Sequence, residues 1–351
     1  MEGIRQSLVV VILLFLILTE AAMNSQQQRT ANNQIGSSLE AFYPIGTPGK
    51  PWTDEEKSLW KAGTKLHRSY REEVLDKLEI LLAKAKGELQ KEQYGALSHD
   101  PERYPLLAIR TTNWQANKPN ILITGGVHGY ETSGVQGAIL FLATKAVEYS
   151  KDCNIVVAPC VSPWAYEHIQ RWQADLKDPN RSFKENEQTE ESKALMNYLN
   201  DLGVTQWDCH LDLHETTDTD ATEFMPAKHA EAGLLYTSEV IPDGFYLVGD
   251  SENPQLEFQK AVIESVKRVT HIAPPDEEGN IIGEPVVSDG IIIVPAKTLG
   301  LCGGVTAGIY TSTTEVYPDS PKVTDDLCNA AQVAAVSGAI DFVLLQQQSC
   351  N

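Results

Sequence analysis

Residues 121–131 join a strand-like apolar run to side chains that can bind a metal ion. The segment reads Ile-Leu-Ile-Thr-Gly-Gly-Val-His-Gly-Tyr-Glu, with Pro119 shortly before it and a Gly-Gly pair at the end of the run. This pattern favours a buried strand over a helix. Imidazole nitrogens and carboxylate oxygens both bind zinc, and side chains three residues apart can reach one ion from a tight turn. We therefore predict that His128 and Glu131 are two ligands of one metal ion at a strand end.

A second alternating segment, residues 207–216, also ends in a histidine, and it reads Trp-Asp-Cys-His-Leu-Asp-Leu-His-Glu-Thr. Together with His128 and Glu131, His214 would give three protein ligands and leave one position open for water, as in a catalytic zinc site. His210 competes for this part, because strand alternation places it on the same face as His214. We favour His214, which lies at the strand end, and interpret His210 as a core histidine.

Between these segments, residues 171–183 contain Arg171, Asn180 and Arg181. Guanidinium groups bind carboxylates through paired hydrogen bonds, so this loop is suited to anchor an anionic substrate group. The alternative is that both arginines pair with surface acids. Asn180-Arg-Ser182 is also the only Asn-x-Ser/Thr sequon of the chain, so a glycan competes for Asn180.

A carboxylate, Glu315, closes a short β-like run at residues 308–318. A zinc hydrolase needs a base that takes a proton from water and returns it to the leaving nitrogen, and Glu315 is our candidate. The alternative is an ordinary exposed carboxylate at a strand end. Glu215 competes for the role of base, while Asp212 could instead orient a ligating histidine through its second ring nitrogen.

Strand-like and helix-like patterns alternate through most of the chain. Strands are expected at residues 106–110, 120–124, 154–161, 207–213, 290–294 and 310–316, and helices at 133–149, 190–202, 255–269 and 324–346. This alternation predicts an α/β fold, a three-layer α/β/α domain whose site lies at the carboxyl ends of the strands. We find no internal repeat and expect one catalytic domain at residues 105–346.

The amino-terminal region is expected to differ from this domain. Residues 1–22 contain an unbroken apolar run, Leu8–Leu18, which is short for a membrane span but fits a signal peptide cleaved near Ala21 or Ala22. The protein is then exported to a secreted, periplasmic or extracellular location. An uncleaved signal anchor is the alternative, and it would be the only contact with a membrane.

Two further amino-terminal segments are expected before the catalytic domain. Residues 23–50 are polar and indicate a flexible segment, and residues 51–104 indicate a helical extension that begins at a capping box, Thr53 to Glu56. Residues 24–104 could act as an inhibitory pro-segment, or the helical extension could simply pack on the catalytic domain.

The formal net charge of −20 argues against a nucleic-acid partner, because an acidic surface repels phosphate. The six cysteines leave room for disulfides in an exported protein. We expect Cys302, Cys328 and Cys350 to be better bridge candidates than Cys209, which reads as a buried thiol. No Cys-x-x-Cys occurs, which argues against a thiolate zinc site.

Four elements, in order, resemble the zinc carboxypeptidase family and its succinylglutamate desuccinylase/aspartoacylase relatives. They are His128-x-x-Glu131, Asn180-Arg181, Asp212-Leu-His214 and Thr313-Thr-Glu315. The resemblance covers roughly residues 105–345, and the first 100 residues contribute nothing to it. It implies a zinc-carboxypeptidase-like fold with a mixed, eight-stranded sheet and one Zn²⁺ ion at the strand ends.

The resemblance also implies roles for individual residues. His128, Glu131 and His214 would hold the zinc ion, and Glu315 would act as general base. Asn180 and Arg181 would bind the substrate carboxylate, while Arg171 would polarise the scissile carbonyl. The chain departs from the pattern in two ways, since neither the tyrosine that closes over the substrate nor a side-chain specificity residue can be matched.

The sequence thus predicts a zinc metallopeptidase, a carboxypeptidase-type enzyme that hydrolyses an amide bond next to a free carboxylate. Its substrate would be a peptide, or an N-acyl amino acid if the chain is instead a deacylase like the aspartoacylase relatives. A binding protein that keeps the fold without activity is a third reading. Against it stands the presence of all three ligands and the base.

Overall fold

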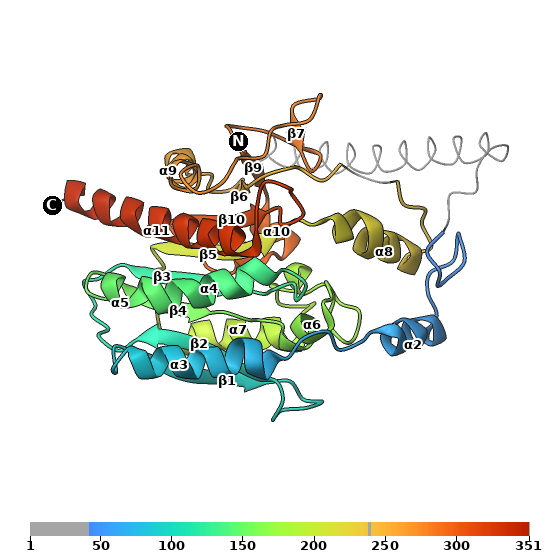
Figure 1. Ribbon diagram of the computed structural model, residues 1–351, viewed down its shortest axis with the longest axis horizontal. Helices are drawn as coiled ribbons and strands as arrows, with labels where there is room; N and C mark the ends of the chain where they lie inside the picture. The colour runs from blue at the N-terminus through green and yellow to red at the C-terminus, as the bar shows by residue number, and fades with distance from the viewer. Residues whose placement is uncertain (1–41, 238–239, 351) are drawn as a thin grey trace, which may run out of the picture. The chain divides into compact units, whose positions relative to one another are not determined.

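A mixed sheet of eight strands forms the centre of the domain. The computed structural model describes residues 42–237 and 240–350, and the compact unit that begins at Ile45 contains the elements given below. The strand order is β1-β2-β4-β3-β5-β10-β6-β9. The predicted α/β fold with a mixed, eight-stranded sheet is therefore confirmed (Figure 1).

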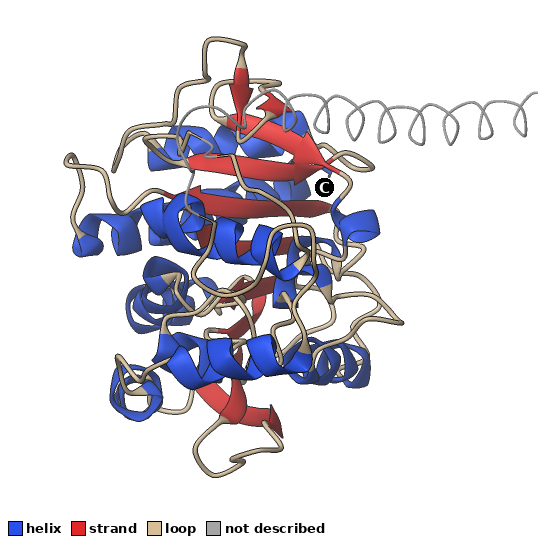
Figure 2. Cartoon of the chain, turned by 90° about the vertical axis from the view of Figure 1, so that its right-hand side faces the viewer, coloured by secondary structure: helices blue, strands red, loops and turns tan. Residues whose placement is uncertain are grey.

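The strands of the main sheet are β1 (Leu89–Ala96), β2 (Pro105–Thr111), β3 (Asn120–Gly125), β4 (Asn154–Ala158), β5 (Cys209–Glu215), β6 (Tyr246–Asp250), β9 (Ile291–Val294) and β10 (Tyr310–Val316). The central strands β4, β3, β5 and β10 are parallel, and so is the pair β6 and β9. Antiparallel pairing joins β1 to β2, β2 to β4 and β10 to β6. A separate two-stranded ribbon holds β7 (Asn280–Ile281) and β8 (Glu284–Pro285). Figure 2 shows the twist that accumulates across the main sheet.

Helices cover both faces of the sheet. On one face α4 (Thr132–Thr144) contacts β3 and β5, α9 (Leu256–Val266) contacts β6, and α11 (Asp325–Cys350) contacts β10 and both helices. On the other face α7 (Glu190–Asp201) packs Leu195 and Leu199 against Ala108 and Val156 of the sheet. Helix α11 is long and apolar enough to cross a bilayer by composition, but half of its most apolar window is buried against the domain, as in a core helix.

The remaining helical segments connect these layers. They are α2 (Asp54–Gly63), η1 (Arg71–Leu75), α3 (Asp76–Lys84), α5 (Ala146–Tyr149), α6 (Pro163–His168), η2 (Pro179–Arg181), η3 (Asp220–Phe224), α8 (Met225–Glu231), α10 (Ala296–Leu299) and η4 (Cys302–Gly304).

The residues of β3 and β4 explain why the centre of the sheet is parallel. Five of the six residues of β3 and all five of β4 are buried, as expected for strands covered by helices on both faces.

Two glycines allow α4 to approach the sheet closely. A Cβ atom on Gly125 would lie 2.3 Å from the carbonyl oxygen of Gly134, and one on Gly134 would lie 2.3 Å from that of Leu213.

The expected helical extension at residues 51–104 is only partly helical. Its first part contains α2, η1 and α3, and the predicted capping box is present, with Glu56 donating its backbone N–H to Thr53 and accepting the Thr53 N–H. Its last part instead forms β1, the edge strand of the main sheet. The segment continues the catalytic sheet rather than preceding it, because β1 pairs with β2 over seven residues.

The structure tests only some of the expectations about the termini and the cysteines. The predicted signal peptide, residues 1–22, and most of the polar segment at 23–50 lie outside the described residues. Cys302 and Cys328, expected as bridge candidates, are free and buried thiols, since core packing encloses each of them, and Cys209 is a buried thiol as expected. The side chain of Cys350 lies outside the described part.

Candidate active site

The three candidate ligands meet at the carboxyl ends of β3 and β5, which are parallel neighbours. His128 lies in the turn after β3, Glu131 directly precedes α4, and His214 lies near the end of β5. Their candidate ligand atoms all lie within 4.8 Å of one another. All three side chains are buried, with at most 2% of each residue exposed. The structure thus brings together residues that are up to 86 positions apart in the chain.

The turn that carries His128 and Glu131 depends on Gly129. A Cβ atom there would lie 2.0 Å from the carbonyl carbon of Ala165 and 2.2 Å from the backbone nitrogen of Tyr166. The turn is also clamped by Arg68, whose Nη2 donates to the Gly129 carbonyl at 2.6 Å. Only glycine lets the backbone pass this close to α6, so the spacing of the two ligands is fixed by packing.

Each histidine is oriented by a carboxylate behind it. The Nε2 atom of His128 lies 3.0 Å from Oδ1 of Asp178, and Nε2 of His214 lies 2.7 Å from Oδ2 of Asp212. A proton on each Nε2 satisfies these contacts, which leaves the Nδ1 lone pair of each ring facing Glu131. Carboxylate partners of this kind fix the ring orientation of metal-ligating histidines and raise their basicity.

The donor set fits a divalent metal ion. The Nδ1 atoms of His128 and His214 lie 2.7 Å from Oε1 and Oε2 of Glu131, respectively. Yet Glu131 Oε2 is buried and lacks a well-formed hydrogen bond, although Nδ1 of His214 lies 2.7 Å away. A cation bound among these atoms would satisfy this oxygen and both ring nitrogens together. Two imidazoles and one carboxylate form a ligand set that zinc commonly takes in catalytic sites.

The pKa values of Glu131 and His214 also support a cation-binding site here. Burial alone would raise the pKa of Glu131, but the neighbouring His214 and His128 lower it to about 2. Burial alone would lower the pKa of His214, but the carboxylates of Glu131 and Asp212 raise it well above its ordinary value. The cluster therefore keeps its carboxylates ionised and attracts positive charge.

Glu315 lies beside the ligand cluster on the next strand. In the parallel pairing of β10 with β5, Glu315 is the register partner of His214. Its Oε2 atom accepts a hydrogen bond from the Thr216 hydroxyl at 2.9 Å, and that hydroxyl lies 2.7 Å from the Tyr246 hydroxyl. Burial raises the pKa of Glu315 to about 8; His214 opposes this shift and Glu131 adds to it.

The structure separates Glu315 from its competitors. Both carboxylate oxygens of Glu215 accept backbone N–H groups at the start of α4, from Thr132 at 2.9 Å and Ser133 at 2.7 Å, so this side chain caps a helix. Asp212 is occupied with His214. His210 is fully buried, and burial lowers its pKa to about 4. It contacts hydroxyl groups and lies outside the ligand cluster.

The candidate substrate-binding residues lie in the same cavity as the ligands. The cavity has a volume of about 330 Å³, and its walls include His128, Glu131 and Glu315 as well as Arg171, Asn180 and Arg181. This is within the usual size range of sites for small ligands.

The two arginines differ in their surroundings. Nε of Arg171 donates to Asp178 at 3.3 Å, and its Nη1 donates to Asp220 at 3.2 Å. Arg171 therefore pairs with acids, as the alternative interpretation of this loop expected, but these acids are largely buried rather than on the surface. Arg181 is exposed and donates to the Asn180 carbonyl oxygen. Among the described residues, no carboxylate lies within 4.0 Å of Arg181. Its charge is therefore available to an anionic ligand.

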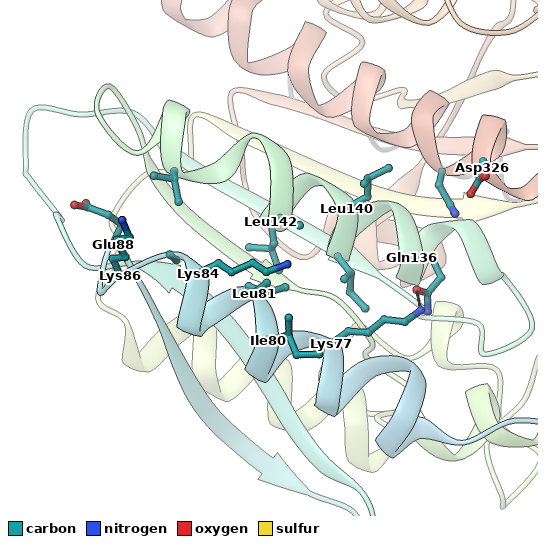
Figure 3. A pocket seen from close by; sticks show the side chains of 15 residues that line it. Lys77, Ile80, Leu81, Lys84, Lys86, Glu88, Gln136, Leu140, Leu142 and Asp326 are labelled. Carbon is teal, nitrogen blue, oxygen red and sulfur yellow. Dashed lines mark hydrogen bonds between the residues drawn. The ribbon is translucent and has the colours of Figure 1, made fainter.

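A larger cavity, of about 750 Å³, lies away from this cluster between α3, α4 and α11. Figure 3 shows its mainly aliphatic walls, with Ile80 and Leu81 from α3 and Leu140 and Leu142 from α4. None of the candidate ligands, the candidate base or the two arginines lines it. The chemistry is therefore concentrated in the smaller cavity.

Comparison with known families gives a match over the part of the chain that holds the ligands. The family model of the Succinylglutamate desuccinylase/Aspartoacylase catalytic domain matches residues 117–239. This region includes His128, Glu131 and His214 and ends before Glu315. No curated protein matches the chain.

Solved structures extend the likeness to nearly the whole domain. A candidate metallopeptidase from Shewanella amazonensis SB2B is 22% identical, with a TM-score of 0.58, covering 80% of this chain and 98% of that one. Carboxypeptidase A from Helicoverpa armigera is 16% identical, with a TM-score of 0.53, covering 80% of this chain and 73% of that one. The chain has the metallocarboxypeptidase fold. Bovine thrombin-activatable fibrinolysis inhibitor, solved with tick carboxypeptidase inhibitor, is also similar, at 13% identity and a TM-score of 0.53 over 80% of this chain and 98% of its own.

The family model and these structures together agree with the resemblance to zinc carboxypeptidases and their succinylglutamate desuccinylase/aspartoacylase relatives. At such identities the likeness to the solved structures is one of fold. The chain thus combines a metallocarboxypeptidase fold with a buried His-Glu-His cluster that could hold a metal ion.

Sequence reasoning gave no role to several residues of this site. Asp178 holds His128, Asp220 holds Arg171, and the pair Thr216 and Tyr246 holds Glu315. Asp178 could have been found, because it lies two residues before Asn180 in the loop already singled out. The others carry no sequence signal, since hydrogen-bond partners from separate loops meet only in the folded chain.

Proposed function

We propose that this protein is a zinc-dependent amide hydrolase of carboxypeptidase type, which cleaves a peptide or amide bond next to a free carboxylate. The observation that carries the proposal is the convergence in one cavity of a buried His-Glu-His cluster, a glutamate beside it and an arginine that no carboxylate contacts among the described residues. Each of these groups would have one role in the reaction.

The cluster supplies the place for the metal. His128, Glu131 and His214 would hold a zinc ion, which supplies Lewis-acid chemistry to a water molecule and to the scissile carbonyl when bound. Asp178 and Asp212 keep both imidazole rings in the tautomer that presents Nδ1 to the ion. With only three protein ligands, a bound zinc ion would remain accessible to the reactants.

Glu315 would take a proton from the attacking water and return it to the leaving nitrogen. A general base must lie within hydrogen-bonding reach of that proton, and the register of β10 with β5 puts Glu315 beside the ligand His214. The Thr216 hydroxyl holds one carboxylate oxygen, so the other remains available for proton transfer.

The two arginines and Asn180 would bind the anionic parts of the substrate. Arg181 faces the cavity from an exposed position and can form a charge-assisted pair with the substrate carboxylate. Arg171, fixed by Asp178 and Asp220, would donate to the oxygen that becomes negative during attack. The distance between the carboxylate anchor and the cluster would then select the bond that is cleaved.

An N-acyl amino acid deacylase is the second candidate function. It is favoured by the match of residues 117–239 to the Succinylglutamate desuccinylase/Aspartoacylase catalytic domain. The same groups would serve, because an N-acyl amino acid also offers an amide beside a carboxylate. Parallel hydrolysis assays with short peptides and with N-acetyl and N-succinyl amino acids separate the two functions.

The decisive experiment replaces the candidate base. Glu315→Gln in the zinc-loaded protein should lower kcat by about 10²–10⁴-fold while metal content stays at one ion per chain. Glu55→Gln, on an exposed position of α2, is the matched control and should leave turnover unchanged. Retention of most activity in Glu315→Gln would remove this residue from the mechanism, and loss of the metal would show that it acts on the cluster instead.

A further inference from the structure

We infer that the cavity selects substrates with an apolar side chain next to the free carboxylate, and that Val248, Val294, Leu299 and Leu301 form the surface that receives it. This inference rests on the proposed function, and it names the substrate class of the same site. All four residues line the cavity that contains the ligand cluster.

The pairing of the strands places the apolar surface beside the reaction site. Val248 of β6 is the register partner of Thr313 of β10, two residues before Glu315 and on the same face of the sheet. On the other side of β6, Val294 of β9 pairs with Asp250, which shares the face of Val248. Since neighbouring strands lie about 4.8 Å apart, the valines lie about one and two strand spacings from β10. That distance suits the side chain of a single residue.

A second set of contacts ties the apolar surface to the carboxylate anchor. The backbone N–H of Phe183 donates to the Gly300 carbonyl at 3.0 Å, and the N–H of Cys302 donates to Oδ1 of Asn180 at 2.8 Å. Gly300 has a positive φ of 70°, and a Cβ atom there would lie 2.7 Å from the Arg181 carbonyl oxygen. Leu299 and Leu301, on either side of Gly300, are therefore held beside Arg181.

The chemistry of this surface favours apolar groups. Val294 and Leu301 pack together with Val248 in one hydrophobic cluster, and each of the first two is 9% exposed. The only charged residue that the β7–β8 ribbon adds to the cavity is Glu284, which is exposed. A charged substrate side chain placed on the walls formed by these four residues would lose hydration, whereas an apolar one would gain from burial.

Binding of product-like ligands tests this selectivity without any turnover. The N-acetyl derivatives of leucine, phenylalanine, lysine, aspartate and glycine share the carboxylate and differ only in the side chain. Calorimetry on the zinc-loaded protein should give dissociation constants about tenfold or more lower for leucine and phenylalanine than for glycine, lysine or aspartate. Tighter binding of the lysine or aspartate derivative would overturn the inference.

Variants locate the selectivity on the proposed surface. Leu299 is 38% exposed, so Leu299→Asp should fold, and it should reduce the ratio of the glycine to the leucine dissociation constant at least fivefold. Leu59→Asp, an equivalent change at a 61% exposed position of α2, should have no effect. An unchanged preference in both Leu299→Asp and Leu299→Ala would refute the assignment.

Two further outcomes distinguish the inference from the function on which it rests. If N-acetylleucine and leucine-ending peptides bind selectively but are not hydrolysed, the proposed function fails and the selectivity stands. If the protein hydrolyses amides but prefers lysine, and Glu284→Gln abolishes that preference, the hydrolase stands and the apolar surface is wrong.

Discussion

Asp178→Asn is the substitution that best tests the construction of the metal site. The carboxylate of Asp178 makes three contacts. It lies 3.0 Å from Nε2 of His128, and it accepts hydrogen bonds from Nε of Arg171 at 3.3 Å and from the backbone N–H of Asn180 at 2.9 Å. Its side chain is only 12% exposed. Burial would raise the pKa of Asp178, but Arg171 and His128 lower it well below its ordinary value, so the carboxylate stays ionised. Asparagine keeps the shape and removes the charge.

The expected loss is in metal affinity. Removing the carboxylate partner of a ligating histidine typically lowers metal affinity by about 10–100-fold, or about 1.4–2.7 kcal/mol. Asparagine can also present its amide nitrogen to His128, which would favour the tautomer that turns a protonated Nδ1 towards Glu131. The corresponding change at Asp212 acts on the other histidine, and because both histidines contact Glu131 the two losses should couple rather than add.

Competition against a chromophoric chelator gives the zinc dissociation constant of each variant. Asp175→Asn is the matched control, because Asp175 lies in the same loop but is 53% exposed and pairs only with Lys177. It should bind zinc like the unmodified protein. An affinity of Asp178→Asn within threefold of the unmodified protein would refute the idea that Asp178 orients His128, and an equal loss in Asp175→Asn would assign the effect to the loop as a whole.

Other consequences of the structure can be tested separately. Thr216→Val should lower kcat about tenfold at unchanged KM, because the general base loses its hydroxyl donor, while Thr216→Ser should retain activity; equal kinetics of the two variants would contradict this. Burial raises the pKa of Glu191 to about 8, so its stabilising contribution is complete below about pH 4.5 and is lost as the pH rises through 8. Urea unfolding of Glu191→Gln should therefore show a gain of about 5 kcal/mol at pH 9 that disappears near pH 4.5, whereas a gain that does not depend on pH would point to another cause. Gly129→Ala should lower the free energy of unfolding by about 1–3 kcal/mol or more and weaken zinc binding, whereas Gly63→Ala, with open space around it, should change stability by less than about 1 kcal/mol.

The sequence predicted best the positions of those elements that have a clear hydrophobic period or capping residues. Strand β10 occupies the residues expected for it, and α7 and α11 begin within one residue of the predicted starts, because period and capping residues mark them. The meeting of His128, Glu131 and His214 could also be predicted, since parallel strands bring their carboxyl ends to one edge. The number of strands came from the family resemblance and not from periodicity.

What the sequence did not predict depends on partners that are distant along the chain. Strand β1 was taken as part of a helical extension, because an edge strand that is half exposed carries as many polar residues as a surface helix. Strand β6 was not predicted, and with it Tyr246 and Val248 were missed. The contacts of Asp220 and Thr216 arise in loops whose paths no local pattern determines.

The position of β10 has a consequence for the order in which this chain can become active. Residues 310–316 insert between β5 and β6, so the strand of the sheet that is synthesised last has a neighbour on each side. Before β10 is in place, β5 lacks one neighbour, and β6 and β9 have no connection to the rest of the sheet. Pairings of such large sequence separation form slowly. A nascent chain would carry the three candidate metal ligands long before it carries Glu315, the proposed base, so the proposed site could be assembled only after residues 310–316 have been synthesised.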